Sequence, residues 1–517
     1  MLLAKILGLI KDRLLAHFFP PDTIDIFWAA FRLPEMIFQI AILAALSVAF
    51  IPVFTEYFEN KSKEEAFELG RSILSITLVI FTLAAVGIYI FASPIISNVI
   101  APGFTPEKQM QVVELTHIII LGQVILIFGT FFIGILQSFQ KFIIPAFAPV
   151  FYNLGIILGI VFLSGSMGIK GAAIGVIAGA ILHALIQLPL ILSLGFRFKF
   201  PFKIFHPGVK EIIKLTGVRT LGLAAEQINE TIGLRFASLI SSGSYTYLTF
   251  AQHLQVAPIG LFGAALAQAA LPVLSAERAR GKMEEFKITL ITTLHQILFL
   301  VLPATAILIV IRIPVVRLIF GASQFNWEAT VLTGLTVAYL AIGLGAQSIS
   351  LLLVRGFYAL KDTRTPVIAS IIVVLVNIAL IYYFVSILRM DVWSIGFANS
   401  IAAILSSTIL FWALHFKTGR FNLRGVFTPF GKMLMATAIM GIALYIPIKL
   451  LDQVIFDTTR TINLLVLTGI SSVFALSVYV ALVAFLRVRE LQTFVDLIKR
   501  ATKFQTSIKP KEIIPPE

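Results

Sequence analysis

Residues 22–56 read DTIDIFWAAFRLPEMIFQIAILAALSVAFIPVFTE, a stretch that is apolar enough to cross a bilayer and still carries charged side chains. Asp25, Arg32 and Gln39 are spaced by seven residues, so on an α-helix they form a polar stripe along one face. A charge at membrane depth is costly unless it faces a bundle interior or water. Pro34 predicts a kink that frees a backbone carbonyl. The stretch therefore predicts a bent membrane helix whose polar face lines a cavity.

Composition places the whole chain in the class of polytopic α-helical membrane proteins. Of its 517 residues 58% are hydrophobic and 13% are charged, and the mean hydropathy is +0.98. Apolar runs of about 20 residues recur, and they do not alternate as the strands of an outer-membrane barrel would. We expect an all-α protein with about 14 transmembrane helices. Their approximate positions are 2–19, 24–54, 72–101, 112–138, 145–164, 169–195, 217–240, 246–275, 288–320, 329–354, 366–387, 392–415, 428–449 and 462–486.

The net charge of +14 is explained by membrane topology. If the N-terminus is cytoplasmic, lysine and arginine concentrate in the cytoplasmic connections, whereas the opposite side holds few. The positive-inside rule then places both termini in the cytoplasm, and nucleic acid is excluded as a partner. The chain has no cysteine, which excludes disulfides and thiolate chemistry.

Two segments are predicted to lie at the membrane surface. Residues 196–214 (FRFKFPFKIFHPGVKEIIK) alternate basic and aromatic side chains, a pattern typical of an interfacial linker on anionic lipids. The residues that follow Arg487 place apolar side chains on one helical face and predict a surface amphipathic helix. The last residues of the chain predict a disordered tail.

A shift of 220 residues brings the quoted stretch onto a second, similar one. Ala44-Ala45-Leu46 and Pro52 fall opposite Ala264-Ala265-Leu266 and Pro272. An even number of spans separates the copies, which predicts a parallel repeat with a site between two halves. Chance similarity among apolar helices is the alternative, because such sequences are of low complexity. The basic linker lies at the midpoint and favours a duplication.

The first predicted span is interrupted by Lys5, Lys11, Asp12 and Arg13. Lys5 and Asp12 are seven residues apart and share a helix face. One interpretation is a basic flank in the cytoplasm, as the positive-inside rule would have it. Because apolar residues continue on both sides of the cluster, at least part of it is expected to face a cavity.

Two acidic residues precede the charged position of the second span. Asp22 is expected to N-cap the helix, and Asp25 would then occupy a position that the helix dipole favours. This structural role is compatible with a role in a site. Arg32 lies a full turn or more inside the apolar span, so we expect it to belong to a functional site.

Polar residues also crowd the seventh and eighth predicted spans. They are Glu226, Gln227, Asn229, Glu230, Arg235, Gln252, His253 and Gln255. A structural ion pair of Arg235, with Glu230 or with a neighbouring helix, is an alternative to a site role. His253 has no second histidine at metal-ligand spacing, so no metal site is predicted. Asn153 and Asn377 are expected to hydrogen-bond between helices rather than to bind a ligand. No P-loop, dinucleotide fingerprint or Ser-His-Asp pattern is present, so we do not expect an enzyme.

Several stretches together carry a family resemblance. They are ILGLIKDRLLAHFF (6–19), DIFWAAFRLPEMIF (25–38), ALSVAFIPVFTEY (45–57), IPAFAPVFYN (144–153), GLFGAALAQAALPVLS (260–275) and GFYALKDTRTP (356–366). In this order, and over essentially the whole chain, they resemble the MurJ/MviN family, the lipid II flippases of the multidrug/oligosaccharidyl-lipid/polysaccharide exporter superfamily. The resemblance implies two six-helix lobes plus two further helices, a cationic central cavity and transport by alternating access.

The repeat and the resemblance together predict five regions of the chain. Residues 1–196 would form the N-terminal lobe and 217–417 the C-terminal lobe, joined by the basic linker 197–216. Residues 418–486 would form the two additional helices, and 487–517 the amphipathic cytoplasmic helix with its disordered tail.

The chain departs from the family pattern at charged positions. Lys5 and Lys11 stand where the family usually has arginine, which keeps the charge but loses the bidentate fork for a pyrophosphate. Gln252-His253 replaces an Asp-Arg pair, so a permanent cation becomes a titratable one. The family's seventh-span aspartate, which is linked to cation binding, falls near Gly233. These changes suggest a divergent branch.

The resemblance implies a flippase for cell-wall biosynthesis in the bacterial cytoplasmic membrane. It would move lipid II, the undecaprenyl-pyrophosphate-linked peptidoglycan precursor, or a related polyprenyl-pyrophosphate glycolipid, from the cytoplasmic to the outer leaflet. The residues expected to hold the pyrophosphate are Lys5, Lys11, Arg13, Arg32 and His253.

Two further sets of residues complete the expected site. Polar residues of the cavity or its gates are Asp12, Asp25, Gln39, Gln252, Arg235 and Glu230. Residues of helix kinks and loop motifs are Pro34, Pro145, Asn153, Asp362, Pro366 and Asn377.

No cofactor is expected, and coupling to the membrane potential or to a monovalent cation is left open. Anionic membrane lipids and other cell-wall synthesis proteins are the remaining expected partners. The alternatives are a cation-coupled multidrug exporter, a flippase for another polysaccharide lipid precursor, and a non-transporting cell-wall scaffold. A drug exporter would favour carboxylates in its cavity, whereas a scaffold has no need of charges at membrane depth.

Overall fold

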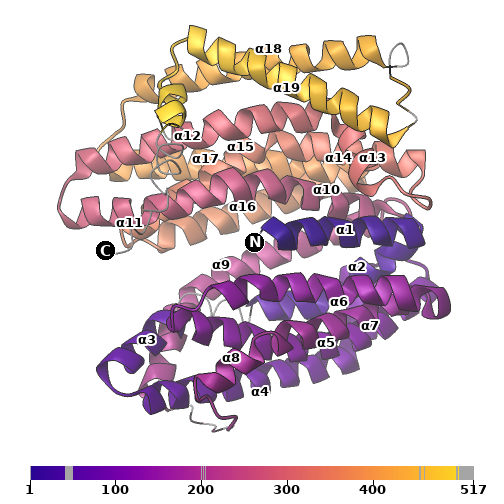
Figure 1. Cartoon of the computed structure of the whole chain (residues 1–517), viewed down its shortest axis with the longest axis vertical. Coiled ribbons are helices and arrows are strands. Elements are labelled where there is room, and N and C mark those ends of the chain that lie inside the picture. Colours follow the sequence, from indigo (N-terminus) through magenta and orange to yellow (C-terminus); the bar gives the residue numbers. More distant parts are fainter. Residues whose placement is uncertain are drawn as a thin grey trace, which may run out of the picture. The chain divides into compact units, whose positions relative to one another are not determined.

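The computed structural model describes residues 2–40, 50–199, 201, 203, 205–452, 456–458, 460–496 and 499. Within these residues the chain is helical and forms no strand (Figure 1). In chain order, with π-helical segments written η, the elements are α1 (Leu2–Phe18), α2 (Pro21–Phe38), α3 (Ile51–Asn60), α4 (Lys63–Ile95), η3 (Ile96–Ile100), α5 (Pro106–Ser138), α6 (Ile143–Met167), α7 (Lys170–Leu185), α8 (Leu188–Ser193), α9 (Pro207–Ser238), α10 (Ser244–Pro258), η4 (Ile259–Ala264), α11 (Ala265–Ala279), α12 (Met283–Val310), α13 (Arg312–Phe320), α14 (Trp327–Ile342), α15 (Leu344–Ala359), α16 (Arg364–Tyr382), η5 (Tyr383–Ile387), α17 (Trp393–Lys417), α18 (Leu423–Leu451) and α19 (Thr461–Phe485).

The predicted class, an all-α polytopic membrane protein, is confirmed. Ten helices of the described chain are long and apolar enough to cross a membrane, and eleven if the bent pair α14 and α15 counts as one span. Helices α1, α2 and α9 lie on predicted spans but are outside this set. Helix α1 has only 17 residues, and α2 and α9 carry several charged side chains each. The number of 14 spans therefore stays a prediction.

Helix α2 passes through its internal proline without ending. Pro34 has no N–H, so the carbonyl of Ala30, four residues earlier, loses its intrahelical partner. The hydroxyl of Thr116 on α5 lies 3.3 Å from that carbonyl oxygen and donates to it. A side chain of a neighbouring helix thus supplies the missing hydrogen bond, as membrane helices require.

The predicted repeat has a counterpart in the backbone. Gln39 and Ile40 have π-helical backbone, and the π-helix η4 begins at Ile259, 220 residues after Gln39. Because π-helical turns are rare, their occurrence at the same repeat position supports a duplication. The Ala44-Ala45-Leu46 part of the repeat lies outside the described residues.

The chain packs as two compact units that do not follow the predicted lobes. The first comprises Met1–Ala257, Val315–Gly343 and Asp362–Ile409, and the second comprises Pro258–Pro314, Leu344–Lys361 and the chain from Leu410 onward. The predicted lobes derive from the sequence repeat, whereas these units reflect the packing of the chain. The lobes therefore stay a prediction.

In the first unit, α6 and α7 lie side by side (Figure 1), and glycines form their closest contacts. A Cβ atom on Gly155 would overlap the backbone of Gly179, and a Cβ atom on Gly159 would overlap that of Gly175. Such close backbone contact replaces the hydrophobic driving force that helices lack within lipid.

In the second unit, α12 packs between its neighbours through side chains that bond to backbone carbonyls. His295 Nε2 lies 3.0 Å from the carbonyl oxygen of Val426, and the Tyr479 hydroxyl donates to that of Phe299 at 3.0 Å. The predicted amphipathic helix is helical over 489–496, and Phe494 stacks on Phe299 with ring centroids 5.1 Å apart. The predicted disordered tail at the end of the chain lies outside the described residues.

The described part of the basic linker lies against α3 and α4. Lys203 forms an ion pair with Glu68, and the ring of His206 lies 5.5 Å from that of Tyr57. His206 Nδ1 accepts a hydrogen bond from the N–H of Gly208 and so caps α9. Burial lowers the pKa of His206, which keeps the ring neutral and able to accept.

We expect Gly155→Val to separate α6 from α7 and to lower the stability of the folded chain by about 2 kcal/mol, because the added atoms overlap backbone. Gly165→Ala is the matched control, since Gly165 lies on the same helix with open space at its Cβ position. Thermal unfolding of the purified variants in detergent measures the difference. Equal unfolding midpoints for the two variants would show that the contact is not needed.

Candidate functional site

The polar stripe of α2 faces helices of the second half of the sequence. Asp25 is fully buried and Arg32 is 3% exposed. Both contact residues about 200 positions later, on α10 and α9 respectively. Three groups of contacts join α1 and α2 to α9 and α10, and we name them the Asp25, Arg32 and Asp12 clusters.

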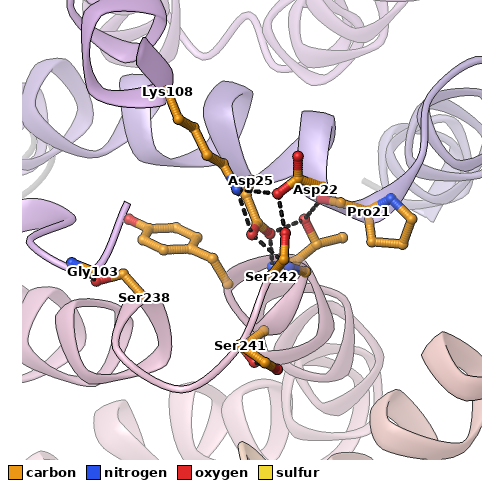
Figure 2. Close-up of polar contacts among 12 residues, drawn as sticks. Pro21, Asp22, Asp25, Gly103, Lys108, Ser238, Ser241 and Ser242 are labelled. Atoms are coloured by element: carbon orange, nitrogen blue, oxygen red, sulfur yellow. Dashed lines mark hydrogen bonds and ion pairs between the residues drawn. The ribbon is translucent and has the colours of Figure 1, made fainter. Parts of the chain in front are cut away.

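The Asp25 cluster consists of Asp22, Asp25, Lys108, Ser242, Gly243 and Thr246 (Figure 2). Asp25 accepts hydrogen bonds from the backbone N–H groups of Gly243 and Thr246, each at 2.8 Å, and from the Thr246 hydroxyl at 2.7 Å. These N–H groups belong to the start of α10 and lack intrahelical acceptors. The carboxylate of one helix therefore caps the positive end of another.

Asp22 does not cap its own helix, so that prediction is wrong. The residue before α2 is Pro20, which has extended backbone and offers no side-chain acceptor, and Pro21 begins the helix. Asp22 instead accepts hydrogen bonds from Lys108 Nζ, at 2.6 Å, and from the Ser242 hydroxyl. Lys108 is 10% exposed and also reaches Asp25 at 3.3 Å, so the two carboxylates share its single positive charge.

The Arg32 cluster consists of Arg32 on α2 with Gln227, Glu230 and Thr231 on α9. The guanidinium donates to the Gln227 carbonyl at 2.7 Å, to the Gln227 side chain at 2.9 Å and to the Thr231 hydroxyl at 2.9 Å. It also forms an ion pair of 2.9 Å with Glu230, whose side chain is 41% exposed. Glu35, one turn further along α2, lies within electrostatic range of Arg32 and Glu230.

The Asp12 cluster consists of Lys11 and Asp12 on α1, Trp28 on α2 and His253 on α10. Asp12 is buried, and its Oδ2 atom lies 2.7 Å from His253 Nδ1. Its Oδ1 atom lies 3.4 Å from Lys11 Nζ. The indole ring of Trp28 contacts both bases, because Lys11 Nζ lies 4.9 Å from its centroid and the His253 ring 5.3 Å from it.

Two of the basic residues predicted to hold pyrophosphate lie outside these clusters. Arg13 donates to the carbonyls of Leu318 and Ile319 at 2.7 and 3.2 Å, at the negative end of α13. Lys5 is exposed on α1. Arg235 does not pair with Glu230, but donates to backbone carbonyls at the end of η3.

Gln39 and Gln252 are the remaining polar residues of the predicted cavity or its gates. Gln39 is half-buried and follows the last residue of α2, so the stripe of α2 reaches its end there. Gln252 is half-buried on α10, beside His253.

The predicted asparagines do hydrogen-bond between helices. Asn153 Nδ2 donates to the Ala4 carbonyl on α1 at 3.3 Å. Asn377 Nδ2 lies 2.8 Å from the Oδ1 atoms of both Asn229 and Asn399, and so joins α16 to α9 and α17.

The predicted loop-motif residues shape helix starts. Asp362 accepts from the N–H groups of Arg364 and Thr365, which begin α16. Pro145 and Pro366 lie in the first turns of α6 and α16, where a missing N–H leaves no carbonyl unpaired.

Sequence reasoning did not select Trp28, Thr246 or Lys108 as site residues. An aromatic residue in a membrane helix and a threonine near a helix start are ordinary, so their residue types gave no signal. In the described part of the chain, no group of three or more histidine, aspartate or glutamate side chains is arranged to hold a metal ion.

Comparisons with known proteins give a consistent result. The family model described as "Lipid II flippase MurJ" matches residues 15–467. A "Probable lipid II flippase MurJ" from Buchnera aphidicola subsp. Acyrthosiphon pisum is 30% identical over 393 residues, which cover 74% of this chain and 76% of that protein. The "Lipid II flippase MurJ" of Burkholderia cenocepacia is 27% identical over 441 residues, which cover 83% of each.

Solved structures agree with the family match. A structure titled "Lipid II flippase MurJ, inward closed conformation" is similar with a TM-score of 0.77 and 26% identity, covering 94% of this chain and 97% of that one. An inward-facing multidrug resistance MATE family transporter is similar with a TM-score of 0.68 and 16% identity, covering 80% of this chain and 94% of that one. At such low identity the second likeness shows the fold alone.

We expect Asp25→Ala to lower the stability of the folded protein by about 2 kcal/mol, because it leaves two buried N–H groups of α10 without acceptors. Asp22→Ala is the control, since Asp22 is 56% exposed and its ion pair is worth less than about 1 kcal/mol. Thermal unfolding in detergent compares them. An Asp22→Ala variant as unstable as Asp25→Ala would contradict the capping role.

Proposed function

This chain belongs to the MurJ family of lipid II flippases, and we propose that it moves lipid II from the cytoplasmic to the outer leaflet of the bacterial cytoplasmic membrane. The family match over residues 15–467 is the observation that carries this function. The protein is a multi-pass transporter and not an enzyme, and the lipid II that it moves supplies peptidoglycan synthesis.

The contacts between α2 and α10 support a transport cycle by alternating access. With both termini in the cytoplasm, the Asp25 cluster lies at the outer end of the helices, as the positive-inside rule orients them. The cluster joins the first half of the sequence to the second through a buried carboxylate. In this proposal it closes the outer gate and opens when the lobes rock.

The substrate pyrophosphate would bind to Arg32, Lys11 and His253. Each of these bases contacts a carboxylate, Glu230 or Asp12, in the described conformation. An incoming pyrophosphate would exchange with Glu230 on Arg32, because Glu230 is partly exposed and the arginine fork fits phosphate oxygens. Exposed Lys5 would attract the anion, whereas Arg13 would keep its structural contact with α13.

Coupling to the membrane potential or to a monovalent cation is part of the same proposal. The site contains the carboxylates Asp12, Glu35 and Glu230 beside its bases. Because uncompensated charge at membrane depth is costly, the negative charge of the substrate must be balanced while it crosses the membrane. The exposed aromatic Phe205 in the basic linker supports contact with anionic membrane lipids. Other cell-wall synthesis proteins are proposed partners at the cytoplasmic face.

The alternatives have less support. The multidrug exporter rests on a likeness of fold at 16% identity. A scaffold without transport would have no use for the buried charges of Asp12, Asp25 and Arg32.

Expression of this chain in a bacterium depleted of its own flippase should restore growth and the accessibility of lipid II at the outer leaflet. Arg32→Ala should abolish both while leaving the protein in the membrane, because it removes the guanidinium and leaves Glu230 without its ion-pair partner. Arg460→Ala is the control, since Arg460 is 79% exposed. Wild-type activity of Arg32→Ala would exclude Arg32 from the site, and an inactive wild-type chain in reconstituted vesicles would overturn the function.

Because the chain has no cysteine, cross-linking can test the outer gate. Asp22→Cys with Ser242→Cys, joined through disulfide bonds by a short bis-methanethiosulfonate linker, should block transport until a reductant cleaves the disulfides, because these side chains are in contact across the gate. The control pair replaces Glu114 and Lys170, which are in contact within the first half of the sequence at 2.6 Å. Transport that continues with the gate pair cross-linked would rule out gate opening at this end.

A further inference from the structure

Trp28 contacts both Lys11 and His253, the two bases of the site that are not arginines. It lies on α2 one turn before Arg32, and the ammonium of Lys11 lies 4.9 Å from the centroid of its ring. The His253 ring meets the indole edge-to-face, with centroids 5.3 Å apart and an angle of 79° between the planes. One indole thus contacts a base from α1 and a base from α10.

Asp12 also contacts both bases. Its two carboxylate oxygens each contact one of the bases, His253 at 2.7 Å and Lys11 at 3.4 Å. The carboxylate supplies charge, and the indole supplies a surface that attracts cations. The charged groups that face His253 are therefore Asp12 and Lys11 from α1, with Glu35 from α2 within electrostatic range.

Neither Lys11 nor His253 can by itself fix the orientation of a bound pyrophosphate. A lysine ammonium is a point charge on a flexible four-carbon stem, and an imidazole offers at most two N–H donors. Both lack the rigid fork by which an arginine binds phosphate oxygens. Their positions must be fixed by what surrounds them, and Trp28 and Asp12 are two side chains that both bases contact.

Trp28 is itself held by aromatic neighbours on the same helix. Its ring centroid lies 5.2 Å from that of Phe27, which is fully buried, and 6.4 Å from that of Phe31. Aromatic pairs at these distances are favourable and restrict the ring. Its neighbours therefore restrict the Trp28 ring, which both bases contact.

We propose that Trp28 is a positioning residue of the lipid II site, which holds Lys11 and His253 as a pair for the substrate pyrophosphate. This inference rests on the proposed function, because the pyrophosphate belongs to that proposal. Trp28 acts through the two bases, so its loss should weaken substrate binding more than it slows the transport step.

Transport of lipid II in reconstituted vesicles tests this role. Trp28→Leu should raise KM about fivefold with little change in kcat, as expected for the loss of about 1 kcal/mol of cation–π interaction. Trp28→Phe keeps a ring and should rescue most of the loss. Trp327→Leu is the matched control, because Trp327 is a tryptophan that is 63% exposed at the start of α14.

A double-mutant cycle separates positioning from a merely structural effect. In a Lys11→Gln, His253→Gln background, Trp28→Leu should add no further rise in KM, because the groups it positions are gone. The same fivefold rise in that background, or an equal effect of Trp327→Leu, would overturn the proposal.

Fluorescence tests the contact without transport, so it remains informative if the wild-type chain does not move lipid II. Replacing Trp327, Trp393 and Trp412 by phenylalanine leaves Trp28 as the single tryptophan. His253→Gln should change the emission of Trp28, because the variant removes the ring that meets the indole edge-to-face. An emission spectrum that is identical with and without His253 would contradict the contact.

Discussion

The burial of the Asp25 carboxylate against the first turn of α10 is the contact on which the arrangement of the candidate site depends. A buried carboxylate without partners would be too costly to keep, and here four donors approach it from α5, α10 and the residues just before α10. It fixes α2 relative to the start of α10. Arg32, two turns further along α2, is thereby brought to α9, and Trp28 to His253.

The three clusters differ in how readily they can open. Asp25 is fully enclosed and bonded to backbone, so its release requires the start of α10 to move. Arg32 bonds partly to side chains, and its carboxylate partner Glu230 is accessible to solvent. The Asp12–His253 contact involves an imidazole whose side chain is 34% exposed. A ligand can therefore displace the carboxylates of the Arg32 and Asp12 clusters while the Asp25 cluster stays intact.

The sequence could predict which face of α2 matters, but not what it meets. The seven-residue spacing of Asp25 and Arg32, and the cost of charge at membrane depth, sufficed to select both residues. Their partners come from about 200 residues away, and Thr246 and Lys108 have no local pattern that distinguishes them. Asp22 was assigned to its own helix because a local cap is the common case, whereas Pro20 and Pro21 begin the helix without one. The all-α membrane class followed from composition, because hydropathy alone separates it from soluble folds.

Hydrogen–deuterium exchange of the backbone N–H groups at the start of α10 tests the central claim most directly. The chain in vesicles would be compared without substrate and during lipid II transport, following Gly243 and Thr246. If Asp25 closes a gate that opens in each cycle, these groups are protected at rest and exchange faster during transport. Equal protection in both states, with transport under way, would contradict the account.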